Sequence, residues 1–149
     1  MNKAFVRFVA TFGYVGLLPI APGTWGSFAG ALICIIAPGT LPLFLILFTV
    51  LGYLVAADAE NIFEKKVPGA FVIDEVSGMM LTVLGLPSTL PVVLAGFFLF
   101  RLFDIWKPWP INIIQRMDSP FVIVHDDLLA GVYANVVLRV GLRFLGVVI

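Results

Sequence analysis

Apolar stretches of the chain are broken by two uncharged, turn-forming segments. Trp25–Ala37 and the longest clean apolar run, Leu41–Ala57, are separated by residues 38–42, where two prolines and a glycine favour a turn. Val76–Phe100 is divided in the same way by residues 87–91, and Leu128–Ile149 forms a last apolar stretch. The pattern predicts an all-α fold, with two helical hairpins and a final helix in a single domain, residues 1–149.

Charges lie outside both turns. They precede the first apolar stretch, follow the first hairpin and follow the second hairpin, so one side of the protein should carry nearly all of them. The members of the last two groups are Asp58, Glu60, Glu64, Lys65, Lys66, Asp74 and Glu75, then Arg101, Asp104, Lys107, Arg116, Asp118, Asp126 and Asp127. Lysine and arginine there predict that this side is cytoplasmic. Arg139 and Arg143, one turn apart in the final helix, either reach the far interface or point into the bundle.

Composition places these helices in a lipid bilayer. Of the 149 residues, 61% are hydrophobic and 12% charged, and mean hydropathy is +1.11, whereas soluble proteins carry roughly 25% charged residues. Several apolar stretches are shorter than the roughly 20 residues that span a bilayer. We therefore expect a compact multi-helix integral membrane bundle, multi-pass, with short or re-entrant hairpins. The net charge of +0 excludes a nucleic-acid partner.

Two acidic pairs, Asp74–Glu75 and Asp126–Asp127, are placed where a charged loop enters an apolar helix. Capping of the helix N-terminus explains one acid at each place. Two adjacent acids at a membrane edge repel each other and are costly to desolvate, and Mg²⁺ would relieve both effects. Both interpretations, helix caps and a metal site, stay open on the residues alone.

Arg101, Asp104 and Lys107 are spaced by three and should share one side of a helix, which Pro108 ends. They form either an ion-pair ladder within the helix or a phosphate site. In the second case Arg101 acts as a planar fork and Lys107 as a point charge, while Asp104 binds metal.

The segment Pro19–Ser27 forms a rigid turn before the first apolar stretch, with Thr24 as the expected N-cap. Free backbone N–H groups there can hold an anion, although a structural role is the simpler interpretation. Gly26 and Gly30 form a small-xxx-small pair suited to close helix packing. The only histidine, His125, either orients a ligand or is exposed.

Absent patterns narrow the chemistry. Thiol phosphatases use a Cys-x5-Arg motif, and no arginine stands at that distance after Cys34. One histidine cannot build the two-histidine site of other lipid phosphatases. The Asp-x-Asp pair of phosphatases with an aspartyl-phosphate intermediate is also absent. A carboxylate-bound Mg²⁺ that activates water remains. The rival class is a small membrane transporter or channel subunit without hydrolytic activity, which predicts charges along a path through the membrane.

Four segments together resemble the phosphatidylglycerophosphatase A family, in order and at plausible spacing. They are PIAPGTWGS (Pro19–Ser27), IDEVSG (Ile73–Gly78), FRLFDIWKPWP (Phe100–Pro110) and HDDLLAG (His125–Gly131). The resemblance implies helices packed around a central one. It also implies a Mg²⁺-dependent phosphatase of the bacterial inner membrane that converts phosphatidylglycerophosphate to phosphatidylglycerol at the cytoplasmic face.

Roles for individual residues follow as expectations. Asp74, Glu75, Asp126 and Asp127 should hold Mg²⁺, with Asp104 as a further ligand or general base. Arg101 and Lys107 should bind the substrate phosphate, helped by Thr24 and Ser27. The catalytic group is then Asp74, Glu75, Asp104 and Asp127, and metal-bound water is the expected nucleophile, with a covalent aspartyl intermediate as the alternative.

Overall fold

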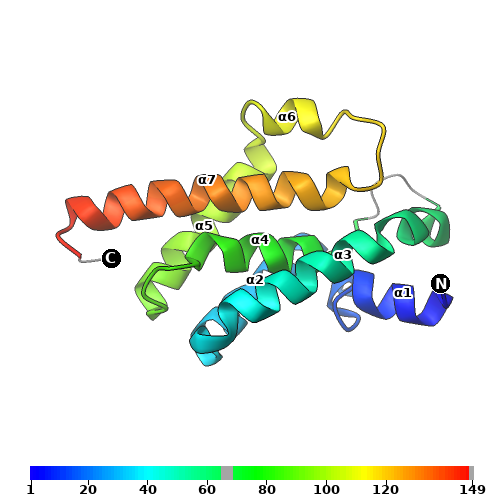
Figure 1. The fold of residues 1–149 in the computed structure, drawn as a ribbon, viewed down its shortest axis with the longest axis horizontal. Helices are drawn as coiled ribbons and strands as arrows, with labels where there is room; N and C mark the ends of the chain where they lie inside the picture. The colour runs from blue at the N-terminus through cyan, green and yellow to red at the C-terminus, as the bar shows by residue number, and fades with distance from the viewer. Residues whose placement is uncertain (65–68, 148–149) are drawn as a thin grey trace.

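Helices are the only regular elements in residues 1–64 and 69–147, the part of the chain that the computed structural model describes (Figure 1). In chain order they are α1 (Lys3–Ala10), η1 (Val15–Leu17), α2 (Pro22–Ile36), η2 (Pro38–Thr40), α3 (Leu41–Phe63), α4 (Ile73–Val83), α5 (Leu90–Trp106), α6 (Ile111–Ile114) and α7 (Val122–Phe144). The all-α prediction is confirmed. Lys65 and Lys66, two predicted loop cations, lie outside the described residues.

Both predicted turns separate helices. Residues 38–42 hold η2 and the first residues of α3, and residues 87–91 hold the end of the α4–α5 connection and the start of α5. Pro42 and Pro91 each occupy the first turn of their helix, where a missing N–H costs nothing. The predicted start of the last helix at Leu128 is wrong. Helix α7 starts at Val122, because its first three residues, Val122–Val124, are apolar and buried.

Helix α4 forms the centre of the bundle, packed against α2, α3, α5 and α7 (Figure 1). Nine of its eleven residues are buried, including the polar Asp74, Ser77 and Thr82. Eleven residues extend only about 16 Å at ~1.5 Å per residue. A helix this short cannot cross a bilayer by itself, so its neighbours determine its position.

Glycines allow the neighbours of α4 to approach closely. A Cβ on Gly131 of α7 would lie 2.5 Å from the Gly78 carbonyl oxygen, and one on Gly78 would lie 2.7 Å from the carbonyl oxygen of Asp127. On α2, a Cβ on Gly30 would lie 2.8 Å from the Val76 carbonyl oxygen, so the predicted packing role of the Gly26–Gly30 pair is confirmed. The acidic end of α4 is therefore held tightly between α2 and α7.

The other end of α4 is capped by side chains of α7. Asn135 Nδ2 donates to the carbonyl oxygens of Leu81, Thr82 and Leu84, at 3.2, 2.8 and 3.1 Å. Arg139 also donates to the Leu84 oxygen (2.8 Å) and holds Asn135 through its Oδ1 (2.8 Å). The half-buried side chain of Arg139 thus contacts the bundle at the end of α4. Asn135 was not singled out from the sequence.

Replacing Asn135 by leucine should lower the free energy of unfolding by roughly 2–4 kcal/mol, because part-buried carbonyls at the end of α4 lose their donor. Denaturant unfolding of the purified protein in detergent measures the change. The exposed Asn112→Leu is the control, with an expected effect within about 0.5 kcal/mol. Equal effects of the two changes would mean that Asn135 does not stabilise the end of α4.

One helical segment in the described residues, Pro38–Phe63, is long and apolar enough to cross a membrane. Only 28% of its most apolar part is buried inside the protein, and Leu43, Ile46 and Leu54 are each more than half exposed. Helix α2 is also apolar but shorter. The fold thus presents large apolar side chains outward, in addition to those in its core.

Candidate active site

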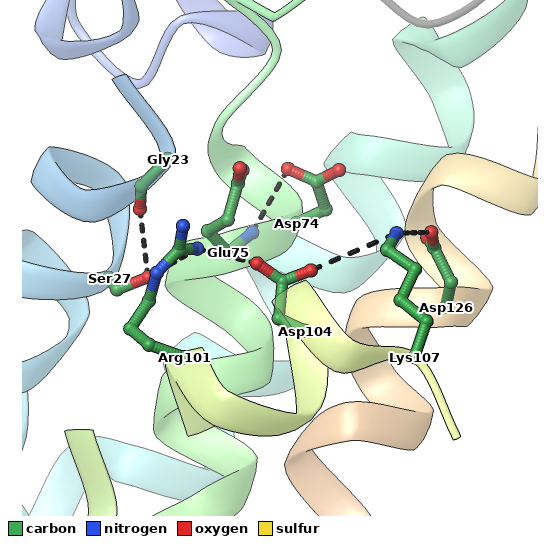
Figure 2. A network of polar contacts seen from close by, with 8 residues as sticks. All are labelled: Gly23, Ser27, Asp74, Glu75, Arg101, Asp104, Lys107 and Asp126. Atoms are coloured by element: carbon green, nitrogen blue, oxygen red, sulfur yellow. Dashed lines mark hydrogen bonds and ion pairs between the residues drawn. The ribbon is translucent and has the colours of Figure 1, made fainter. Parts of the chain in front are cut away.

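Four helices bring polar side chains to one place (Figure 2). The first turn of α4 supplies Asp74 and Glu75, as predicted. The last turns of α5 supply Arg101 and Asp104, and Lys107 follows as the C-cap of that helix. The acidic pair 126–127 lies in the second turn of α7 and not at a loop boundary, because α7 begins at Val122. The first turns of α2 complete the site with Gly23 and Ser27.

Three carboxylates converge in the manner of a metal site. Asp74, Glu75 and Asp127 each offer an oxygen atom, and these atoms lie within 4.8 Å of one another. Asp74 is 3% exposed and Asp127 is 4% exposed. Burial, and after it the charges of nearby carboxylates, raises the pKa of Asp74 and of Asp127 well above the usual range. An ionised cluster of this kind needs a cation to offset its repulsion.

Unpartnered oxygens test whether a divalent cation suits this cluster. Within the described residues, the buried Glu75 Oε2 and Asp127 Oδ2 have no hydrogen-bond partner. Buried polar atoms normally have one, so the two oxygens are free to bind an ion. The cavity beside them is about 100 Å³, the space of a few waters at about 30 Å³ each. Carboxylates and water are the usual ligands of Mg²⁺, so the donors suit that ion.

Two cations border the acidic cluster. Arg101 Nη1 lies 2.5 Å from Asp104 Oδ2 and 3.5 Å from the Ser27 hydroxyl. Lys107 Nζ pairs with Asp126 and lies 3.9 Å from the other oxygen of Asp104. Asp104 therefore sits between both cations (Figure 2). The predicted ion-pair ladder is present on α5. It also contacts the neighbouring helices, through Ser27 of α2 and Asp126 of α7.

The start of α2 corrects one expectation. Thr24 is not the N-cap: Ala21 is, at φ +51°, and the Thr24 N–H donates to the Ala21 carbonyl (2.9 Å). The helix begins at Pro22, earlier than expected, because the proline ring fixes a helical φ at the first position. A Cβ on Gly23 would lie 2.4 Å from Glu75 Oε1 and 3.3 Å from Arg101 Nη1, so glycine lets this turn lie against the site.

All five predicted acids line one cavity, but their contacts differ. Asp74, Glu75 and Asp127 form the cluster that could hold metal, whereas Asp104 and Asp126 pair with cations. Ser27 donates to the Gly23 carbonyl oxygen (2.8 Å) and contacts Arg101. His125 is exposed, with Nδ1 2.8 Å from the Phe121 carbonyl oxygen. Gly23 was missed as a site residue, although its place in a Pro-Gly-Thr-Trp-Gly turn was a visible signal.

Comparisons with known proteins identify the family of this chain. A family model described as phosphatidylglycerophosphatase A matches residues 8–142. A protein of that name from Haemophilus influenzae is 38% identical over 133 residues, covering 82% of this chain and 79% of its own. The Escherichia coli protein of that name is 35% identical over 123 residues, covering 78% and 72%.

A third relative bears a different name. A Bacteroides thetaiotaomicron protein named putative phosphatidylinositol-3-phosphatase is 31% identical over 143 residues, covering 88% of this chain and 89% of its own. No solved structure matches. The family match covers most of the chain and contains all the acidic and basic side chains of the site, so the chain belongs to the phosphatidylglycerophosphatase A family of lipid phosphatases.

Proposed function

We propose that this protein hydrolyses the terminal phosphate of phosphatidylglycerophosphate to give phosphatidylglycerol, and that it depends on Mg²⁺. One observation carries the proposal: three carboxylates converge, two of them on buried residues, beside two cations that are partly buried. Carboxylates bind a divalent ion. A divalent ion, together with arginine and lysine, binds the negatively charged oxygens of a phosphate. The names of the relatives from H. influenzae and E. coli support this substrate.

Asp74, Glu75 and Asp127 are the proposed metal ligands. Mg²⁺ bound there would polarise phosphate oxygens and make a bound water more acidic. Of the two remaining acids, Asp126 on α7 is the stronger candidate for a further ligand, because one of its oxygens is buried without a partner, although Lys107 holds the other. Asp104 has both oxygens near cations.

The other side chains act on the phosphate itself. Arg101 and Lys107 donate hydrogen bonds to its oxygens, and Asp104 holds both cations in position. Ser27 and the first turn of α2, with Thr24, border the phosphate from the Arg101 side. Water attacks phosphorus, the bond from phosphorus to the glycerol oxygen breaks, and that oxygen takes up a proton as inorganic phosphate leaves.

We place the protein in the bacterial inner membrane as a multi-pass protein, with the site at the cytoplasmic face. All three tryptophans of the chain lie on the segments that carry the site, in the first turn of α2 and around the end of α5. Trp25, Trp106 and Trp109 are 44%, 68% and 72% exposed. Tryptophan prefers the interface between membrane and water. At that level a diacyl substrate keeps its chains in lipid while its phosphate reaches the acidic site.

The rival transporter function loses support. It depends on charges in mid-membrane, and the final helix offers two candidates, Arg139 and Arg143. Arg139 instead caps the end of α4, where it holds the Leu84 carbonyl oxygen and Asn135. Its position is explained by a structural role.

Phosphate release by the purified protein in detergent tests the proposal. With phosphatidylglycerophosphate and Mg²⁺ we expect release of inorganic phosphate and phosphatidylglycerol, and excess EDTA should stop it. Phosphatidylinositol 3-phosphate is the informative second substrate, because one relative is named for it. Well-folded protein that releases phosphate from neither lipid would refute the phosphatase and restore the transporter hypothesis.

A further inference from the structure

An apolar groove of about 280 Å³ lies between α1 and α3, close to the start of α4. Its walls include Phe8, Phe12, Phe48, Val9, Leu51 and Ile73. Phe8 is 52% exposed, so the groove opens on the surface of the protein. The shape and lining suit a flexible hydrocarbon chain.

The groove and the acidic cavity are both lined by residues at the start of α4. Ile73, which forms part of its wall, immediately precedes Asp74, and both side chains are buried. The acidic cavity is itself lined in part by Phe71 and Ile123, and these two pack with Val9 and Ile73 in one apolar cluster. A shared apolar layer thus connects the walls of the groove and of the acidic cavity.

The backbone fixes this arrangement. The Val72 N–H donates to the Ala10 carbonyl oxygen (2.8 Å), which ties the end of α1 to the residue before α4. Helix α1 therefore cannot move away from the acidic end of α4 without breaking that bond.

A second groove has a similar apolar lining, so the α1–α3 groove differs from it in location and not in the chemistry of its walls. It measures about 310 Å³ and lies between α5 and α7, with Pro91, Ala95 and Leu142 in its walls. Those walls come from the start of α5 and the end of α7, whereas the acidic site uses the opposite end of each helix. Of these two grooves, the α1–α3 groove is the one with a wall residue adjacent in sequence to the acidic cluster.

We propose that the α1–α3 groove holds one acyl chain of the phospholipid whose terminal phosphate enters the acidic site, an inference that rests on the proposed function. Lipid tails are as apolar as the groove, so moving a chain between them releases little free energy. The groove acts by orientation: a chain fixed beside Ile73 holds the head group within reach of the site.

Two substrates and two variants test the groove. Leu51→Trp fills it, and Ala95→Trp, in the α5–α7 groove, is the matched control. For dioleoyl phosphatidylglycerophosphate in detergent, Leu51→Trp should lower kcat/KM by roughly tenfold, because the chain is misplaced. For the dibutanoyl lipid, whose short chains do not reach along the groove, kcat/KM should stay at the wild-type value. Ala95→Trp should leave both substrates unaffected.

Equal effects on both lipids in a Leu51→Trp protein that is well folded, or no effect on either, would overturn the proposal. So would an Ala95→Trp protein with the same selective loss. A measurement without turnover covers the case in which Leu51→Trp folds poorly: phosphatidylglycerol with a diazirine on one chain should crosslink wild-type protein within residues 8–13 or 48–51. Crosslinks only at residues 91–99 or 137–145 would refute it. Wild-type protein that hydrolyses neither lipid would instead refute the proposed function, whatever the crosslinks show.

Discussion

Asp127→Asn should lower phosphate release by at least about a thousandfold while leaving the protein folded. Asparagine keeps the size of the side chain but removes one of the three converging charges, from a position where Asp127 Oδ2 is buried and unpartnered. Because this charge lies among other buried acids, its removal relieves repulsion. Without Mg²⁺, the variant should therefore unfold at the same temperature as the wild type or at a higher one.

A thermal-unfolding titration with Mg²⁺ separates this prediction from simple damage. Binding to the folded state stabilises wild-type protein, by about 2.7 kcal/mol at a hundredfold excess over Kd, and the variant should lose most of that gain. Asp58→Asn is the control, because Asp58 pairs with the N-terminal amine at the surface and is not one of the three converging carboxylates. Asp127→Asn protein that keeps a tenth of the activity would exclude Asp127 as a metal ligand.

The helix pattern was readable because proline and glycine mark its boundaries. The turns at 38–42 and 87–91 and the end of α5 before Pro108 all follow from local chemistry. Helix α1 was not predicted, since eight residues with two cations give a weak signal. The role of Arg139 could not be predicted either, because its partner Leu84 is 55 residues away in the chain.

The acidic pairs were visible in the sequence, but the division of labour within them was not. Successive residues of a helix point about 100° apart, so adjacent acids face different partners. On α7, Asp127 faces Asp74 and Glu75, whereas Asp126 pairs with Lys107. The close contact of Gly78 with Gly131 sets the rotation of α7 against α4, and that contact depends on the whole fold. Sequence reasoning therefore gave one role to five acids that line a single cavity, whereas three of them converge and the other two pair with cations.

Arg101→Lys should lower kcat/KM by about a hundredfold, although it preserves the charge. The guanidinium of Arg101 contacts Asp104 and Ser27 from one nitrogen, and its buried Nε has no hydrogen-bond partner in the described residues. A planar fork can hold those contacts and still donate to a phosphate, whereas the single ammonium of lysine cannot. Steady-state kinetics with phosphatidylglycerophosphate measure the loss.

The matched comparison is the exchange of lysine for arginine at the second cation, Lys107. Lys107→Arg should cost less than about tenfold, because Lys107 acts as a point charge beside Asp126 and any cation of similar reach replaces it. Both variants should keep the stabilisation by Mg²⁺, since neither residue belongs to the carboxylate cluster. A loss of Mg²⁺ stabilisation in Arg101→Lys would mean that Arg101 supports the metal ligands and does not bind the phosphate. Equal kinetic losses in the two variants would show that charge alone, and not the shape of the guanidinium, matters at this site.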